Sequence, residues 1–455
     1  MIAPNARPDS TRKSGTEALV SVGAWAPGRH TVVVASCLMS SYDVDEWLRV
    51  AKGECSATWE LWSRPIETAS CLTERGQATA KWAVEKISAF LGDEWLQKSM
   101  SGPINSWMWA PWNDVPHTFR RIIELGARIA TVAPGKRWRD LKRLARQHTD
   151  WEDVLLQLEV AALAVRDGWE AELEPPLPSG KKADLRLSRH GASFLVESTL
   201  LGFSQRFQEV NRFSDQAMSA LQTIASRNGL AVSGELRNVV DDDRLRSWLD
   251  EVASTAEHLR GSRLSAVVAV PGGGEIELSA SDNHSARERG LSGPAEASNE
   301  TPRLVRTLER KARQGAGDEP LWIRLDEGGA IWHLTAPSPQ PDRRTMHEAL
   351  AEIIRTVVDS FLHVAGVVMS EIPMAGTGGR RPEQWMLAGG RGVGLRRPLA
   401  SGFGREAVMV AGTHRDSAEQ LGAWIRWYEG ESSWLDWALP YHDQPPLREM
   451  IVPPA

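Results

Sequence analysis

The sequence is poor in the residues that cross-link a chain or anchor it in a membrane. Only three cysteines, Cys37, Cys55 and Cys71, occur in 455 residues, and no two of them form a C-x-x-C pair. Such sparse cysteine argues against a disulfide framework and against a zinc site, and it fits a reducing cytoplasm. There is no run of about 18 apolar residues, so we predict no transmembrane helix and no membrane partner. We therefore expect a cytoplasmic chain.

Basic charge is also missing at the level of the whole chain. The formal net charge is -6, so a nucleic-acid partner would have to be held by local basic patches. Several catalytic motifs are absent as well. The sequence contains no Walker A loop, no H-E-x-x-H and no G-x-S-x-G, so no built-in motor, zincin or nucleophile elbow is predicted.

Tryptophan, by contrast, is abundant. Most of the 20 tryptophans lie between residues 25 and 169 and between 385 and 437. Because each carries a large apolar area, we interpret them as anchors of a core or of an interface with a second copy or another protein. Base stacking is the alternative.

The length predicts two or three domains. Residues 1–15 lack the apolar core of a signal peptide, and we expect a disordered lead there. Residues 16–148 are predicted to be mainly helical, with helices at 73–92 and 117–133 and one strand at 30–39. Residues 373–455 are expected to begin with Gly/Arg-rich loops and to end in a Trp-rich helical extension.

Between residues 149 and 372, predicted strands and helices alternate, which indicates an α/β architecture. A helix is expected from Asp150 to Gly168. Two short strands, 183–188 and 193–199, follow as a hairpin joined by 189–192. Further helices are predicted at 204–228, 241–261, 302–314 and 344–362, and strands at 230–236, 263–271, 320–326 and 364–371, with a long surface loop at 272–301.

The hairpin contains the residues that point to chemistry. Strand periodicity puts Leu195, Glu197 and Thr199 on one face. A carboxylate in an apolar strand is costly unless it is paired or bound to metal. The hairpin would bring Asp184 close to Glu197. Together with the backbone carbonyl of Ser198 they would form a hard oxygen site suited to Mg²⁺, which can orient a scissile phosphate and lower the pKa of its bound water.

This layout resembles the PD-(D/E)XK nuclease superfamily over residues 150–215: Glu159 on the helix, Gly168 after it, Asp184, and Glu197 two residues before Thr199. The resemblance implies a restriction-endonuclease-like mixed sheet flanked by helices, and hydrolysis of DNA phosphodiesters in restriction or defence. It also implies Asp184 and Glu197 as metal ligands, Glu159 as a helper, and Mg²⁺ (or Mn²⁺) as the cofactor.

Thr199 departs from the family pattern, which has lysine there. A threonine hydroxyl can hold a water molecule but supplies no charge. Lys182, two residues before Asp184, and the neighbouring Lys181 are candidate replacements, although solvated turn residues are the alternative reading. Gln205 and Arg206, at the start of the next helix, are further candidate donors. A nuclease fold that has lost catalysis and only binds nucleic acid or a protein partner is the rival hypothesis.

Three basic clusters favour a nucleic-acid groove. Within 302–314, one helix face carries Arg303, Arg306, Arg310 and Arg313, ready for phosphate contacts, and another carries Val305, Leu308 and Ala312. Basic residues also gather at 135–146 and at 389–397. Each cluster alone is typical of a solvated face, but three on an acidic chain favour binding.

Overall fold

The computed structural model describes residues 49–50, 54–101, 116–147, 151–178, 180–202, 205–280, 290–294, 300–314, 319–326, 343–370, 374–375, 383–387, 390–398 and 403–452. The strand predicted at 30–39 and the capping residue Asp150 lie outside these ranges. Among the described helices, none is long and apolar enough to cross a membrane.

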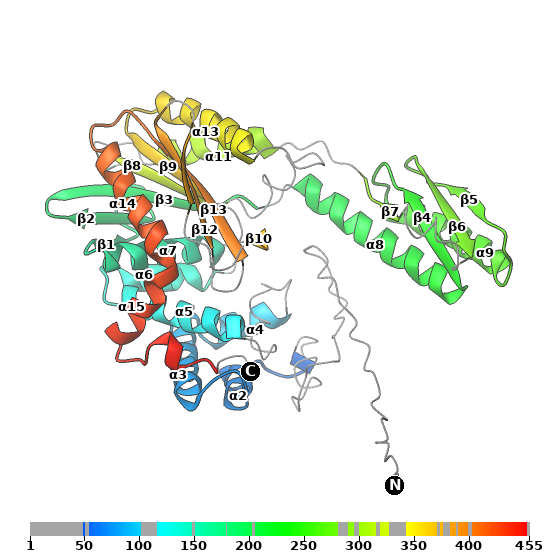
Figure 1. The fold of residues 1–455 in the computed structure, drawn as a ribbon, viewed down its shortest axis with the longest axis horizontal. Helices are drawn as coiled ribbons and strands as arrows, with labels where there is room; N and C mark the ends of the chain where they lie inside the picture. Colours follow the sequence, from blue (N-terminus) through cyan, green and yellow to red (C-terminus); the bar gives the residue numbers. More distant parts are fainter. Residues whose placement is uncertain are drawn as a thin grey trace, which may run out of the picture.

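A mixed sheet of nine strands lies at the centre of the larger part of the molecule (Figure 1). Its order is β1-β2-β3-β8-β9-β13-β12-β11, and β10 pairs with β13. Strands β3, β8 and β9 run parallel, whereas every other pairing in this sheet is antiparallel. The bounds are β1 Glu170–Leu173, β2 Leu185–Arg189, β3 Ala192–Leu200, β8 Leu321–Asp326, β9 Val364–Ser370, β10 Met374–Ala375, β11 Glu383–Met386, β12 Gly392–Pro398 and β13 Phe403–Ala411. The predicted hairpin and the strands at 320–326 and 364–371 are confirmed.

The two faces of this sheet pack against different helices. Even-numbered residues of β3, such as Val196, join the core that contains α7 (Trp151–Arg166). Odd-numbered residues, such as Leu195, join the core that contains α11 (Glu300–Gln314) and α13 (Arg343–Ser360). Helix α7 ends at Arg166, and Gly168 two residues later has a φ of +78°, a left-handed conformation that glycine adopts without steric cost.

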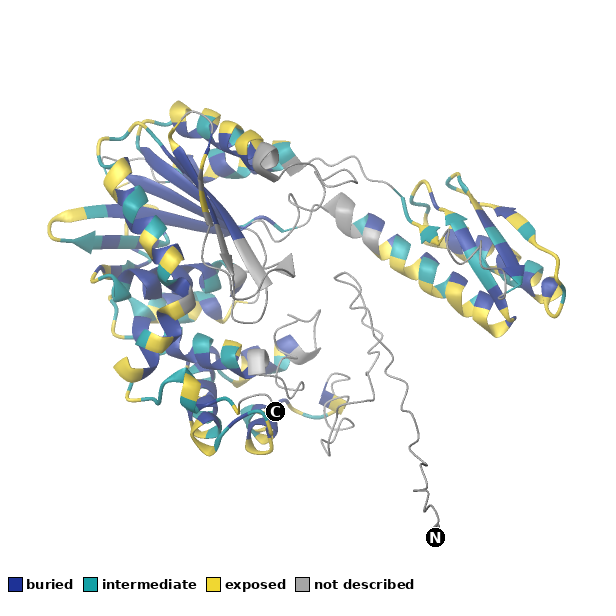
Figure 2. Cartoon of the chain, viewed as in Figure 1, coloured by how far each residue is buried: buried dark blue, intermediate teal, exposed yellow. Residues whose placement is uncertain are grey.

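A second, smaller unit lies between β3 and α11 in the sequence. It comprises α8 Gln205–Arg227, β4 Leu230–Glu235, α9 Asp242–Leu259, β5 Ala266–Ala269, β6 Glu275–Ala280 and β7 Leu291–Ser292, and its four strands form a separate sheet in the order β5-β6-β4-β7. Its apolar residues form a core of their own, and Figures 1 and 2 show this unit apart from the nine-stranded sheet. Asp241, the first residue of the helix predicted at 241–261, is the N-cap of α9 and accepts a hydrogen bond from the Arg244 backbone N–H at 2.9 Å.

The surface loop predicted at 272–301 is wrong at 275–280, where β6 forms. Ile276 and Leu278 are buried and alternate with Glu275 and Glu277, but this short alternation lies among Gly and Ser residues that favour a loop locally. Pairing with β4 and β5 on either side supplies the contacts that decide the strand.

The Gly/Arg-rich loop predicted at 389–397 is also wrong, because 392–398 forms β12 between β11 and β13. A Cβ atom at Gly392 would lie 3.0 Å from the Met409 carbonyl oxygen, so glycine permits close packing here. The nine-stranded sheet therefore runs across the boundary expected at 372–373, since β13 pairs with β9.

The N-terminal helices and the C-terminal tail share one core with the sheet. The helices are α2 Trp59–Glu67, α3 Glu74–Leu91, α4 Asp93–Ser101, α5 Pro116–Val132 and α6 Trp138–Ala145, followed near the C-terminus by α14 Ser417–Gly430, the 3-10 turns Glu431–Ser433 and Leu447–Glu449, and α15 Trp434–Tyr441. The helices predicted at 73–92 and 117–133 are confirmed as α3 and α5. The tail returns to α3, where the Thr73 hydroxyl donates to the Glu449 carbonyl at 2.6 Å.

Most tryptophans of the described region are core residues. Trp62, Trp95, Trp151, Trp322, Trp424 and Trp434 are all less than 2% exposed. They contribute to the shared core between the N-terminal helices, the sheet and the tail. The interpretation as core anchors therefore accounts for these six without a second chain.

Candidate active site

The β2–β3 hairpin brings Asp184 and Glu197 together. Leu185 pairs with Val196, so Asp184, the residue before Leu185, stands opposite Glu197 in the antiparallel register. Glu197 is 2% exposed and lies on the face of β3 that packs against α11. The two predicted metal ligands thus lie next to each other, as the sequence suggested.

A lysine that the sequence reasoning did not consider reaches both carboxylates. Lys311 on α11 donates a hydrogen bond to Glu197 Oε2 at 3.0 Å, and its Nζ lies 3.5 Å from Asp184 Oδ2. Its side chain is only 10% exposed. Leu304, Leu308 and Lys311 follow 4-3 spacing along the buried side of the helix, so a lysine in the apolar stripe was the signal that could have revealed it.

Hydrogen bonds fix the position of Asp184. Its Oδ2 accepts from the Ser198 backbone N–H at 2.6 Å and from the Ser198 hydroxyl at 3.0 Å. These bonds tie the start of β2 to β3 and hold the carboxylate beside Lys311. The role predicted for the Ser198 carbonyl as a metal ligand stays a prediction.

Burial has the largest effect on the ionisation of Glu197. Burial, and then the Asp184 carboxylate, raise the pKa of Glu197 to about 8 although Lys311 lowers it. The pKa of Lys311 is itself raised, because Asp184 and Glu197 stabilise its charge against burial. With all three groups ionised, one negative charge is in excess.

Two other carboxylates flank this group. Burial and the Asp184 carboxylate raise the pKa of Glu174 to about 7, and its backbone N–H donates to the Asp184 carbonyl at 2.9 Å. Glu174 adopts a φ of +50°, an uncommon backbone conformation that recurs at functional sites. Asp153 on α7 accepts from the Leu200 backbone N–H at 2.8 Å and contributes to the raised pKa of Lys311. Sequence reasoning missed both residues.

The predicted replacement lysines lie elsewhere. The Lys182 Nζ is 3.6 Å from Asp140 Oδ2 and 3.9 Å from Glu174 Oε2, so it contacts the edge of the site and not the Asp184–Glu197 pair. Lys181 is exposed. Thr199 is buried on the Glu197 face, as its strand position requires. Gln205 and Arg206 begin α8, and their side chains lie outside the described part of the structure.

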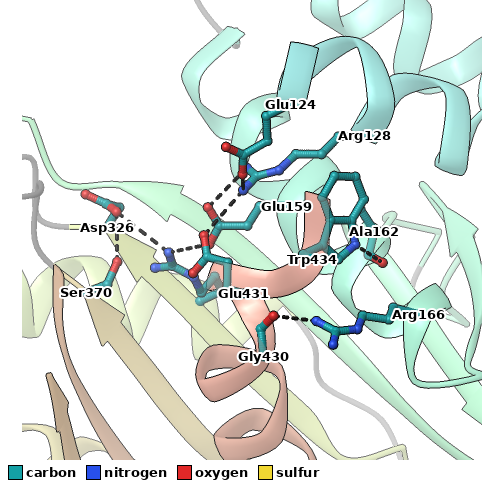
Figure 3. A network of polar contacts seen from close by, with 11 residues as sticks. Glu124, Arg128, Glu159, Ala162, Arg166, Asp326, Ser370, Gly430, Glu431 and Trp434 are labelled. Atoms are coloured by element: carbon teal, nitrogen blue, oxygen red, sulfur yellow. Dashed lines mark hydrogen bonds and ion pairs between the residues drawn. The ribbon is translucent and has the colours of Figure 1, made fainter. Parts of the chain in front are cut away.

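Glu159 does not join the other two carboxylates. Its Oε1 accepts from Arg324 at 3.1 Å and its Oε2 from Arg128 at 3.4 Å (Figure 3). Arg324 is paired with Ser198 in the strand register, whereas Glu197 is paired with Ile323. Glu159 therefore lies on the opposite face of the sheet from Glu197. The helical position of a carboxylate was correct, but the periodicity of α7 could not show which sheet face it would reach.

The network around Glu159 joins three parts of the chain. Arg128 of α5 also contacts Glu124 at 2.6 Å and Glu431 at 3.3 Å, and Arg324 lies 3.6 Å from Asp326. Figure 3 shows these side chains converging from the N-terminal helices, the sheet and the tail. Such a buried, mutually paired set of charges has a structural role in fixing the relative positions of these elements.

The arginines of α11 divide into two groups. Arg306, Arg310 and Arg313 are exposed, in agreement with the predicted outward row. Arg303 is half-buried and donates to the Gly202 carbonyl at 2.8 Å. Since Lys311 is on the opposite side of this same helix, α11 carries both the buried site lysine and an exposed basic face.

One carboxylate oxygen at this site is available to bind a metal ion. Glu197 Oε1 is buried and has no hydrogen-bond partner, which is costly for a carboxylate oxygen unless a cation or a donor approaches it. Within the described ranges, no group of three or more His, Cys, Asp and Glu side chains could hold a metal ion. Mg²⁺ commonly binds proteins through one or two carboxylates and completes its shell with water and substrate phosphates. The Asp184–Glu197 pair fits that mode and does not fit an all-protein cage.

Comparison with known proteins adds no assignment. No protein-family model matches the chain, and neither a curated protein nor a solved structure matches it.

Proposed function

We propose that this chain is a metal-dependent nuclease of restriction-endonuclease-like fold that hydrolyses DNA phosphodiester bonds. The observation that carries the proposal is the contact of the buried Lys311 ammonium with both Asp184 and Glu197. The helix, the hairpin, the paired carboxylates and a lysine are the parts that the resemblance to the PD-(D/E)XK superfamily calls for. The lysine comes from α11 in this chain, and Thr199 occupies the strand position where the family has it.

In this proposal each side chain has a distinct task. Asp184 and Glu197 would hold Mg²⁺ or Mn²⁺, which would stabilise negative charge on the phosphate and activate a water molecule. Lys311 remains protonated at neutral pH because its pKa is raised. It would therefore act as a charged donor that orients the attacking water or stabilises the developing charge, and not as a base. Ser198 positions Asp184 by its two hydrogen bonds.

The test uses supercoiled plasmid, single-stranded DNA and RNA with Mg²⁺ or Mn²⁺. Asp184→Ala, Glu197→Ala and Lys311→Met are expected to abolish or strongly reduce cleavage. Loss of one positioned transition-state donor typically lowers the rate about 10²- to 10³-fold. Lys181→Ala and Lys182→Ala are the matched controls and are expected to keep most of the activity. Undiminished cleavage by both carboxylate variants sinks the assignment, and loss in Lys182→Ala but not in Lys311→Met returns the lysine role to the β2 turn.

A binding protein without catalysis is the second candidate. The observation that favours it is the same ion pair, because Lys311 neutralises part of the carboxylate charge without any metal. This candidate predicts DNA binding in EDTA, no cleavage with either metal, and no heat of Mg²⁺ binding by calorimetry.

A further inference from the structure

A cavity of about 440 Å³ lies between the N-terminal helices and the C-terminal tail. Its lining combines aromatic rings with two lysines: Trp82, Phe90, Trp138, Tyr441, Lys86 and Lys142. The volume is within the range of about 300–1,000 Å³ that small-ligand sites occupy. Tyr441 is 60% exposed, so the cavity opens to solvent at that side.

The aromatic rings are held by stacking on one another. Trp138 stacks on the buried Phe90 with centroids 4.8 Å apart, and Tyr441 stacks on Trp437 at 5.0 Å. Trp82 lies against His442 at 5.8 Å, whose Nε2 is 2.9 Å from the Thr131 hydroxyl. These contacts fix the rings in place, so little conformational entropy is lost in the protein when a flat ligand packs against them.

The charged residues that line the cavity carry a net formal charge of +1, from Lys86, Lys142 and Asp443. Lys86 Nζ lies over the Trp82 ring at 5.9 Å. In the part of the chain that the structure describes, neither Lys86 nor Lys142 has an ion-pair partner. Burial and Lys86 lower the pKa of His442. The lining also contains the acidic residue Asp443 beside the two lysines. A neutral apolar ligand would leave both ammonium groups unused.

We propose that this cavity binds one nucleotide unit of single-stranded nucleic acid, with the base stacked on the Trp82, Trp138 and Tyr441 side and its phosphates at Lys86 and Lys142. Aromatic faces with adjacent cations are the combination by which proteins bind single strands without base-specific hydrogen bonds. The inference stands on the cavity itself, and only its relation to catalysis rests on the proposed function.

Helix α6 connects the cavity with the candidate active site. Trp138 and Lys142 are four residues apart and line the cavity on one side of this helix. Asp140, on its other side, contacts Lys182 at 3.6 Å, and Arg143 acts on the pKa of Glu174. Helix α6 therefore lies between the cavity and Lys182, which is at the edge of the candidate site.

The experiment measures binding of a fluorescent single-stranded DNA hexamer to the full chain in EDTA, where no cleavage interferes. The double variant Lys86→Glu, Lys142→Glu is compared with Lys81→Glu, Arg139→Glu, which makes the same charge changes on the same two helices outside the cavity. We expect at least about tenfold weaker binding for the first pair and a salt slope smaller by about 0.7 per lysine lost. Tyr441→Ala, a change at an exposed residue, should weaken binding about 5- to 150-fold, as loss of one base-stacking contact does.

Two further probes identify the ligand. An abasic strand of the same length should bind more weakly, and Tyr441→Ala should not weaken it further. Competition by a free mononucleotide would show that a nucleotide alone suffices, and its absence would show that the strand is required; either result supports the proposal. Equal binding by the cavity and control double variants, or equal binding of abasic and normal strands, overturns it. These binding outcomes do not depend on the proposed nuclease activity, because cleavage does not occur in EDTA. A separate cleavage assay of Glu197→Gln distinguishes the two proposals: this variant should lose cleavage and bind the hexamer as the wild type does.

Discussion

Lys311 sets the balance of charge around Asp184 and Glu197. Without its ammonium group, the buried Glu197 and the partly buried Asp184 would lie side by side without the positive charge that Lys311 brings to both. Because Glu197 can take up a proton instead, its charge is not forced to remain unpaired. The side chain therefore affects both folding stability and the protonation of the site.

At this residue we predict a measurable coupling. Lys311→Met should lower the free energy of unfolding by roughly 1–3 kcal/mol at pH 7, the cost of leaving a buried polar group unsatisfied. That is less than the ~3–5 kcal/mol lost when a buried pair is broken and the remaining charge cannot neutralise. Glu197→Gln should lower the free energy of unfolding less in the Lys311→Met background than in the wild type. Urea unfolding of the four proteins measures the coupling, and strict additivity would contradict a direct interaction.

The raised pKa values of Glu174 and Glu197 predict a pH dependence of stability. In the folded state the pKa of Glu174 is about 7 and that of Glu197 is about 8, against 4.5 for an ordinary Glu. Between pH 4.5 and pH 8 the folded state binds more protons than the unfolded state. The contribution of these two groups to the free energy of unfolding is therefore fully present below pH 4.5 and is lost as the pH rises through 8.

The measurement is urea unfolding at pH 5.5 and pH 8 in EDTA. The wild type should lose more stability over this interval than Glu174→Gln, Glu197→Gln, and Mg²⁺ at pH 8 should restore part of the loss by binding the folded state. A loss of equal size in the wild type and the double variant would show that these two carboxyl groups are not its source.

At the scale of elements, helix α11 has two chemically different faces. Leu304, Leu308 and Lys311 lie on its buried side, and Arg306, Arg310 and Arg313 on its exposed side. The same helix therefore supplies the site lysine and presents a row of guanidinium groups to solvent. This arrangement suits a helix that approaches the phosphate backbone near the site.

We predict that Arg306→Glu with Arg310→Glu weakens binding of duplex DNA in EDTA. Each lost phosphate contact should reduce the slope of log affinity against log salt by about 0.9. The control is Arg244→Glu with Arg246→Glu on α9. These two arginines are exposed as well, and each lies within ion-pair distance of an aspartate on α9 or at its N-cap. If both pairs reduce binding equally, the effect is one of net charge and α11 has no special part in it.

At the scale of the whole molecule, the unit from α8 to β7 is an insertion into the larger fold. Its core residues belong neither to the core around α7 nor to that around α11. The two ends of the insertion meet, since Arg303 donates to the Gly202 carbonyl. A chain that leaves and returns at one place leaves the surrounding sheet continuous.

We therefore expect that residues 205–294 can be replaced by a short Gly/Ser linker of about six residues, enough to span roughly 20 Å. The remaining chain should still unfold cooperatively, as followed by circular dichroism on heating. Trp248→Ala is the companion variant: it removes a buried side chain of the inserted core and should unfold that unit without shifting the transition of the rest. A common loss of both transitions would show that the two units fold as one.

Local periodicity alone predicted much of the fold and half of the site. The alternation in β2 and β3, the helical stripes of α3, α5 and α11, and the capping residue Asp241 act over a few residues, so the sequence determines them directly. The same short range placed Asp184 opposite Glu197. It failed for β6 and β12, whose stability comes from partners on both sides, and whose Gly-rich neighbourhoods favour loops when read in isolation.

What only the tertiary structure decided is which distant side chains meet. Lys311 lies 114 residues from Glu197, and a lysine on an amphipathic helix looks like a solvated residue until the helix is packed on the sheet. The resemblance to the PD-(D/E)XK superfamily placed Glu159 at the site, yet the packing of α7 turns it to the other face and into a network with Arg128 and Arg324. Sequence sets the faces of each element, and packing between elements sets which faces share a site.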